Sequence, residues 1–447
     1  MDRNMTRDGL RAGFGAVDIT PPVGLPMAGA LDPRTNRGTS DPLLAKAIHV
    51  EGIGGTATLV GLDLIGVPRH IADAAIREAS RRAGLDPASI MISASHTHSG
   101  PYMSAASDKR HLVDEAYLAS LPGRIADSIV AAVEARQPAV FSLGRSLVYR
   151  GIYHRRVIAK HDGLAINAWM RGLLNDLDAV PQVLGAAGVI DPELWVARFD
   201  APDGGTLGFL VNFSLHVNSR FGELWSADYP GVIAARLAEA FGGSIVSVFT
   251  PGACANVNPT YAGEEWLKGA EFFAAQAVDA ARRARRIEGP IHVGASRLDL
   301  TVPRRDPQSQ REGAIDRLNW GSGAGRQDVF GPLLKWVAEM PEQLNIPVSA
   351  ARIGPLGIAS NAGELFVEWG LDIKRRSPFK HTIISQLTND TLGYQPDKAG
   401  FAAEGYETLI GANRISPEGI GMLVDSAVSQ LERLAAATTT SARKEHA

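Results

Sequence analysis

The chain has 447 residues, of which 45% are hydrophobic and 21% are charged, and its formal net charge at pH 7 is -3. This composition predicts a folded globular protein with an extensive core. The near-neutral charge balance gives no basic field for nucleic acid or for anionic membrane surfaces, so we expect neither as a partner. The single cysteine excludes an intramolecular disulfide and any metal site built from several thiolates.

The N-terminal residues 1–10 lack the apolar segment of a secretion signal. No later stretch offers the roughly 18 consecutive apolar residues that a transmembrane helix needs. We therefore expect a cytoplasmic protein without a transmembrane segment.

The first third of the chain alternates strands with helices. Pro21 and Pro22 end a first strand that begins near Arg11, because proline cannot donate to a sheet ladder. Hydrophobic periods of two and of 3.6 residues distinguish the strands from the helices that follow. They predict strands over 45–50, 56–64, 88–94 and 139–149, and helices over 68–83 and 114–135.

The remainder of the chain begins with an irregular stretch to about Gly188 and then returns to the same alternation. The turn sequence over 201–205 joins strands over 194–200 and 206–213 into a hairpin. Further strands are predicted over 244–249, 291–302, 348–353 and 356–360, and one more begins at 383. Helices are predicted over 264–286 and 329–340, and three others end at 241, 376 and 437.

This alternation predicts an α/β fold in which a layered, mixed β-sheet core is flanked by helices. We expect one domain over 11–437 and a disordered polar tail over 438–447, because the tail has no core-forming pattern.

A His-Thr-His pair stands where the buried strand over 88–94 opens into a loop, in Ser95-His96-Thr97-His98-Ser99-Gly100-Pro101. On an extended chain the side chains of His96 and His98 would point to the same face. One imidazole could then bind a metal ion while the other carries a proton beside it. Such a pair also occurs by chance, but loops at strand ends are where scaffolds usually place chemistry.

A second histidine also follows a predicted strand. His216 comes after the strand over 206–213, as His96 and His98 come after the strand over 88–94.

Six strings, ordered along residues 11–435, together resemble the neutral/alkaline ceramidases, a family of zinc-dependent N-acylsphingosine amidohydrolases. The strings are Gly-Ala-Val-Asp-Ile-Thr-Pro-Pro, Ser-His-Thr-His-Ser-Gly-Pro, Asn-Phe-Ser-Leu-His, Ser-Ala-Asp-Tyr-Pro-Gly, Asn-Ala-Gly-Glu, and Gly-Tyr followed by Tyr-Glu. The resemblance implies a neutral-ceramidase-like catalytic domain with a metal site at strand ends. We expect it without the C-terminal immunoglobulin-like domain of ceramidases, for which the chain leaves no room.

The resemblance implies a Zn²⁺ site with four ligands: His96, His216, Glu364 and Tyr394. Each of these residues follows a predicted strand, so all four can converge on one end of a sheet. Without the resemblance, Glu364 would be typical of a solvated acid at a helix start, and Tyr394 of a half-buried aromatic residue. Zinc accepts this nitrogen and oxygen set with a position left for water. By the same resemblance, His98 and Tyr406 are proton carriers or oxyanion donors, and Arg155 contacts the substrate or the transition state. His154 stands before Arg155 where the family usually has Asn.

One loop departs from the family. Ceramidases carry Gly-Asp-Val-Ser-Pro-Asn after the central strand, and their serine takes part in amide cleavage. This chain has Ala-Asn-Val-Asn-Pro at 255–259. An amide is neither nucleophile nor general base, but it can hydrogen-bond an oxyanion, so we expect Asn258 to act in that way with Arg155.

The sequence thus predicts a zinc-dependent hydrolase that cleaves an amide bond of a soluble small molecule through a metal-activated water. The absence of a Gly-x-Ser-x-Gly elbow and of a His-Glu-x-x-His helix disfavours serine hydrolases and zincins. Three alternatives stay open: a metal-dependent esterase, a true ceramidase, and a non-catalytic protein that only binds its ligand. The oligomeric state is also left open.

Overall fold

The computed structural model describes residues 9–30, 32, 34–103, 111–159, 165–167, 183–312, 314 and 327–444. Three sheets form the core of this part of the chain. The first has the strand order β7-β6-β5-β1-β8 and the second the order β17-β15-β14-β9-β19. The third has the order β20-β21-β22-β24. This arrangement confirms the predicted α/β fold with mixed sheets.

The first sheet is antiparallel except where β6 and β7 run parallel. Helices α1 (Arg69–Ala83) and α2 (Glu115–Glu134) pack against each other, and α2 lies on β1 and β5. The strands of this sheet are β1 (Arg11–Asp18), β5 (Leu44–Gly52), β6 (Gly55–Leu62), β7 (Ile90–Ala94) and β8 (Gln137–Pro138).

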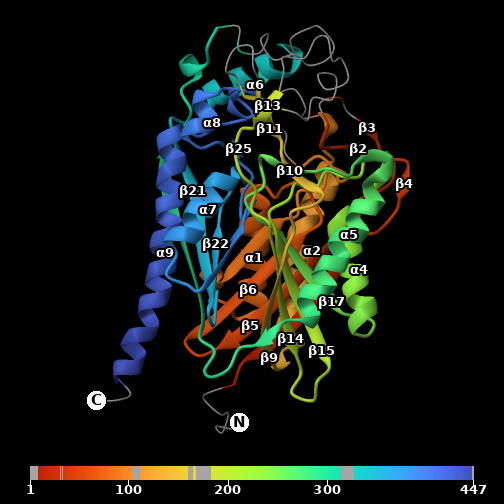
Figure 1. Cartoon of the computed structure of the whole chain (residues 1–447), viewed down its shortest axis with the longest axis vertical. Helices are drawn as coiled ribbons and strands as arrows, with labels where there is room; N and C mark the ends of the chain where they lie inside the picture. The colour runs from red at the N-terminus through yellow and green to blue at the C-terminus, as the bar shows by residue number, and fades with distance from the viewer. Residues whose placement is uncertain are drawn as a thin grey trace.

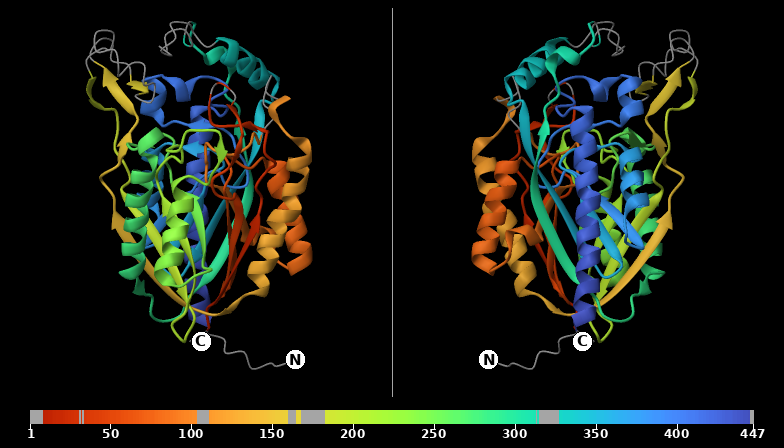
Figure 2. Two further views of the ribbon diagram at one scale, coloured as in Figure 1. Left: turned by 90° about the vertical axis from the view of Figure 1, so that its right-hand side faces the viewer. Right: turned by 90° about the vertical axis from the view of Figure 1, so that its left-hand side faces the viewer.

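The second sheet carries helices α4 (Tyr229–Phe241) and α5 (Trp266–Arg282) on the side opposite to α1 and α2 (Figure 2). Strands β15 and β17 are its parallel pair. The strands of this sheet are β9 (Val140–Leu147), β14 (Glu193–Asp200), β15 (Thr206–Phe213), β17 (Val246–Pro251) and β19 (Arg285–Arg286).

The third sheet is covered by the long helix α9 (Pro417–Lys444) (Figure 1). This helix continues into the segment for which the sequence predicts a disordered tail. Once a helix is formed, each further residue adds one hydrogen bond, so polar residues can extend it without any core pattern. The strands of this sheet are β20 (Val293–Pro303), β21 (Gln343–Ile353), β22 (Leu356–Ser360) and β24 (His381–Ser385).

The sheets pack directly on one another, and their shared core contains buried side chains from all three. Strand β6 approaches β17 so closely that a Cβ atom at Gly61 would lie 2.4 Å from the carbonyl oxygen of Phe249. Only glycine fits at this crossing. The packing brings the ends of β7, β15, β17, β22 and β24 to one region of the molecule.

Short elements complete the described chain. Among them are strands β10, β11, β12 and β13, which lie in the stretch predicted as irregular. For the described residues of this stretch that prediction was wrong. These strands are too short to show a hydrophobic period, and β10 pairs with a distant segment, β18. The short strands are β2 (Pro26–Met27), β3 (Arg34–Thr35), β4 (Gly38–Thr39), β10 (Ile152–His154), β11 (Arg156–Ala159), β12 (Ala165–Asn167), β13 (Val183–Ala186), β16 (Leu224–Trp225), β18 (Val257–Pro259), β23 (Glu364–Leu365) and β25 (Tyr394–Gln395). The remaining helices are α6 (Gln327–Glu339), α7 (Val367–Arg376), α8 (Lys398–Ala402), η1 (Pro87–Ser89), η3 (Gly263–Glu265), η4 (Pro307–Ser309) and η5 (Tyr406–Thr408).

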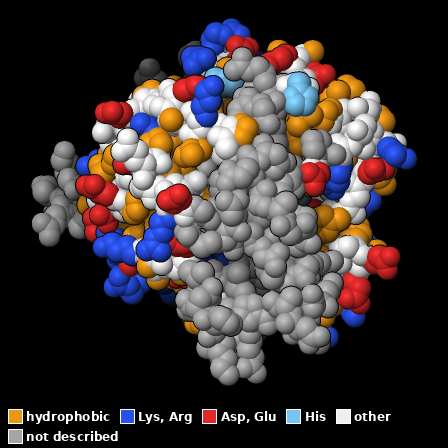
Figure 3. Space-filling view, turned by 90° about the horizontal axis from the view of Figure 1, so that it is seen from above, with side chains coloured by type: hydrophobic (Ala, Val, Ile, Leu, Met, Phe, Trp, Pro, Cys, Tyr) orange, Lys and Arg blue, Asp and Glu red, His pale blue; other side chains and the backbone are white. Residues whose placement is uncertain are grey.

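Helices α6 and α8 lie at the same end of the molecule as β10 and β25 (Figure 1). Seen from above, the described side chains of this end mix basic and acidic groups with hydrophobic ones (Figure 3). Within the described residues, none of the helices combines the length and apolar character that crossing a membrane requires.

Candidate metal centre

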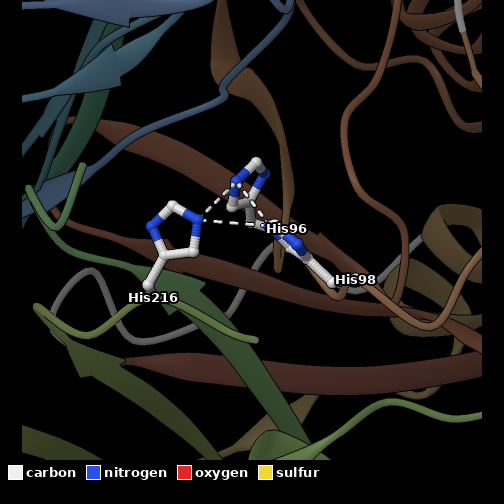
Figure 4. Close-up of side chains that lie close together, drawn as sticks. All are labelled: His96, His98 and His216. Carbon is white, nitrogen blue, oxygen red and sulfur yellow. Dashed lines mark hydrogen bonds between the residues drawn. The ribbon is translucent and has the colours of Figure 1, made fainter. Parts of the chain in front are cut away.

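Three histidines meet at the ends of two strands. His96 and His98 follow β7, and His216 follows β15. The Nε2 atom of His216 lies 3.1 Å from that of His96 and 3.2 Å from that of His98. The Nε2 atoms of His96 and His98 are 3.3 Å apart (Figure 4). All three side chains are buried, and their Nε2 atoms converge on a single point.

The backbone at His96 differs from the extended chain that the sequence predicts. His96 has a φ of 73°, in the left-handed region that residues other than glycine rarely adopt. The two imidazoles therefore meet through a turn of the loop rather than through the alternation of a strand. Such a conformation persists only where surrounding contacts hold it, and it is common at functional sites.

Each ring is oriented by a backbone carbonyl on its other nitrogen. The Nδ1 atom of His96 lies 2.7 Å from the oxygen of Ile65, and that of His98 lies 2.7 Å from the oxygen of Gly29. The Nδ1 atom of His216 lies 3.4 Å from the oxygen of Cys254. A carbonyl oxygen only accepts hydrogen bonds, so Nδ1 carries the proton in each neutral ring and Nε2 carries the lone pair.

Three lone pairs therefore face one another without a proton between them. Burial lowers the pKa of His98 and of His216 well below the usual range, and the nearby His96 acts in the same direction. Protonation is thus an unfavourable way to relieve the repulsion, whereas a cation between the rings would relieve it. Nitrogens at about 2.0–2.1 Å from a tetrahedral zinc ion are about 3.3 Å apart. The spacing here fits such an ion.

Glu364 adds an oxygen to the cluster. Its Oε2 atom lies 3.2 Å from Nε2 of His96 and is buried, with no hydrogen-bond donor among the described residues. The sequence places this residue at a helix start, but it lies on the short strand β23, ahead of α7. Strand β23 pairs in parallel with β25, and this register sets Glu364 beside Tyr394.

The aromatic and cationic residues expected at the site lie around the same point. The ring centroids of Tyr394 and Tyr406 are 5.2 Å apart, and the guanidinium carbon of Arg155 lies 5.1 Å from the Tyr394 centroid. Burial raises the pKa of Tyr394 well above its usual range, and the negative charge of Glu364 adds to this effect. The Nε atom of Arg155 donates a 2.9 Å hydrogen bond to the buried carboxylate of Glu407.

A cavity of about 280 Å³ opens beside the cluster. Its polar wall contains seven of the predicted residues: His96, His98, Arg155, His216, Glu364, Tyr394 and Tyr406. Its apolar wall includes Ile65 and the α6 residues Val329, Phe330 and Leu333. The cavity is therefore large enough for a small organic molecule next to the histidines.

Known structures share this architecture. Neutral ceramidase from Pseudomonas aeruginosa matches with a TM-score of 0.71 and 19% sequence identity, over 96% of this chain and 75% of that chain. The chain has a neutral-ceramidase-like fold. A ceramidase complexed with C2 matches with a TM-score of 0.71 and 16% identity, over 95% of this chain and 75% of that chain. No protein-family model and no curated protein sequence matches. The resemblance seen in the sequence is thus confirmed for the fold.

Within this neutral-ceramidase-like fold, Asn258 is the predicted site residue that is not among the described residues of the cavity wall. It lies on β18, opposite Tyr153 of β10, and it is absent from the described residues that line the cavity. Asn256, two residues earlier, has a structural role. The Asn256 amide donates to Glu368 at 2.8 Å and accepts from the backbone N–H of Val367, so it ties the loop to the start of α7.

Several residues of the site carry no motif in the sequence. The carbonyl of Gly29 orients His98, and Arg34 donates a 2.7 Å hydrogen bond to the carbonyl oxygen of His98. Asn218 and Arg414 line the cavity, and Asn218 Oδ1 is buried without a hydrogen-bond partner in the described part of the chain. The glycine-rich loop after the first strand was the available signal for Gly29. Nothing comparable marks Asn218 or Arg414.

Proposed function

We propose that the chain is a zinc-dependent hydrolase that cleaves the C–N bond of an acyl amide in a small molecule. The observation that carries this proposal is the convergence of four buried atoms at the wall of a cavity. Three are histidine Nε2 atoms with their lone pairs, and the fourth is a carboxylate oxygen that has no hydrogen-bond donor among the described residues. The likeness of fold to neutral ceramidase supports an amide as the bond that is cleaved.

The proposed ligands are His96, His98, His216 and Glu364. His98 joins the set because its Nε2 atom is as close to the other two rings as they are to each other. Tyr394, which the family resemblance implies as a ligand, lines the same cavity and stays a candidate for a further position. A zinc ion bound there would act as a Lewis acid and lower the pKa of its water to around 7.

The chain's own side chains supply the remaining chemistry. Arg155, held in place by Glu407, presents a cation to the cavity where an oxyanion would develop. Burial raises the pKa of Tyr406 to about 12, with the charge of Glu364 in the same direction. Tyr406 therefore keeps its proton at neutral pH and can donate a hydrogen bond to the oxyanion or a proton to the leaving nitrogen.

The size of the cavity bears on the substrate. Pockets for organic ligands commonly span about 300–1,000 Å³, and this cavity of about 280 Å³ is just below that range. The α6 side chains give it an apolar wall that suits an acyl group. A molecule smaller than a long-chain ceramide fits this volume best.

The test is hydrolysis that depends on metal. Purified protein with added Zn²⁺ would be screened against N-acyl amino acids, fatty amides, lactams, aryl esters and a short-chain ceramide. We expect amide turnover that a chelator abolishes and zinc restores, and that is lost in His216→Ala. The exposed His70 of α1 gives a matched control, since His70→Ala should keep full activity. Saturable binding without turnover of any compound would instead favour the non-catalytic binding protein.

A further inference from the structure

This inference rests on the proposed function and concerns the charge of its substrate. Among the described residues that line the cavity, Glu364 is the one carboxylate, whereas two guanidinium groups face it, Arg155 and Arg414. A divalent metal ion would make the cavity still more positive. The wall is therefore complementary to a ligand that carries a negative charge.

The two arginines differ in how their charges are compensated. Arg155 is paired with Glu407, and its Nη2 atom lies 2.8 Å from Oε1 of that carboxylate. Arg414 has no carboxylate within ion-pair distance in the described part of the chain. The carboxylates of Asp390 and Glu364 are near enough to favour its charged form, but burial outweighs them and lowers the pKa of Arg414 to about 10. Arg414 is therefore still a cation at neutral pH.

Arg414 is also held in a fixed orientation. Its guanidinium carbon lies 4.5 Å from the ring centroid of Trp336 on α6, and its Nη1 atom donates a 3.2 Å hydrogen bond to the carbonyl of Thr391. Its Nε atom is buried and has no hydrogen-bond partner among the residues that the structure describes. A planar guanidinium that is stacked on an aromatic ring, and whose Nε–H has no partner among the described residues, is oriented in advance to bind a carboxylate.

We propose that the substrate is an acyl amide that bears a carboxylate, and that Arg414 binds this carboxylate while the amide lies at the histidine cluster. An N-acyl amino acid carries the carboxylate on its amine part, and a monoamide of a dicarboxylic acid carries it on its acyl part. Hydrolysis consumes one water: the C–N bond breaks, a C–O bond forms, and the products are a carboxylate and an ammonium group after the proton moves to the leaving nitrogen.

The experiment compares matched compounds in wild-type protein, Arg414→Met and Arg414→Lys. The compounds are an N-acyl amino acid, the monoamide of a dicarboxylic acid, and an N-alkyl amide in which a methyl group replaces the carboxylate. Wild type should prefer one of the carboxylates. Arg414→Met should lower kcat/KM for that compound about 10- to 100-fold, mainly through KM, and change the neutral amide less than about three-fold. Arg414→Lys should restore part of the loss.

The control is Arg375→Met, because Arg375 is exposed on α7 with a side chain 75% accessible to solvent. Zinc content should be equal in all variants. An equal loss for charged and neutral amides in Arg414→Met, or a wild type without preference for a carboxylate, would overturn the inference.

Direct titration of the same compounds separates this inference from the proposed function. If wild type turns over none of them but binds a carboxylate amide more weakly after Arg414→Met, the anion site stands and the hydrolase fails. If turnover occurs while affinity for the carboxylates does not depend on Arg414, the hydrolase stands and the anion site fails.

Discussion

The Nε2 atom of His98 lies 3.2 Å from the Nε2 atom of His216, although 118 residues separate them in the chain. The contact joins the loop after β7 of one sheet to the loop after β15 of another. Each ring is held from behind by a backbone carbonyl, so the loops present two lone pairs to the same point. Packing of the two sheets therefore positions the candidate metal centre.

His98 gives the first prediction, because it separates a ligand from a proton carrier. If His98 binds the ion, His98→Ala should lower zinc affinity at least ten-fold, and His96→Ala should do the same. Zinc titration against a competing chelator measures this. A variant that keeps wild-type zinc affinity and shows only an altered pH profile would assign His98 to proton transfer instead.

Gly29 gives the second prediction. A Cβ atom at Gly29 would lie 2.5 Å from Cβ of His98, so Gly29→Ala should displace that imidazole and weaken zinc binding. Gly24 is a matched control, since it also has a positive φ but open space around it. Both variants should lose about 1 kcal/mol of stability from backbone strain. Equal zinc affinity in the two variants would show that the close contact between the Gly29 backbone and His98 does not position the His98 ring.

Glu407 gives the third prediction. Its carboxylate is fully buried and faces both Arg155 and Arg156. Glu407→Gln leaves two buried cations without their partner and should lower the free energy of unfolding by about 3–5 kcal/mol. Urea denaturation checks this. In the exposed pair of Arg236 and Glu239, Glu239→Gln should change stability by less than about 1 kcal/mol; a similar small change for Glu407→Gln would contradict the prediction.

His49 gives a prediction on pH. It is buried on β5 beside Thr58, and burial lowers its pKa to about 4. Between pH 6.5 and 4 the unfolded chain binds a proton that the folded chain does not, so stability falls as pH falls. From pH 7 to pH 5 the contribution of this one residue should drop by about 2 kcal/mol. In His49→Asn, the decrease in the free energy of unfolding from pH 7 to pH 5 should be smaller than in wild type by that amount. An equal decrease in the two proteins would refute the assignment.

The residue set that the family resemblance implies could be predicted from the sequence, and the predicted strand ends agree with it. His96, His216, Glu364 and Tyr394 each follow a predicted strand, and the structure brings all four to one cavity. Asn258 also follows a strand, but the pairing of β18 with β10 keeps it out of the described wall of that cavity. No local pattern encodes that pairing.

The geometry of His98 could not be predicted in the same way. It depends on the left-handed backbone of His96 and on the carbonyl of Gly29, which comes from a loop 69 residues earlier. Arg414 was missed for a similar reason, since its place in the wall depends on stacking against Trp336 of α6. Contacts between distant segments decide both positions, and sequence periodicity carries no information on them.

The metal content of the purified chain tests the central claim most directly. Protein prepared without chelator and supplied with Zn²⁺ would be measured by elemental analysis next to His216→Ala and His70→Ala. We predict about one zinc ion per chain in wild type and in His70→Ala, and its loss in His216→Ala. A wild-type chain that stays free of metal with zinc supplied, or a His216→Ala chain that keeps its zinc, would contradict the account.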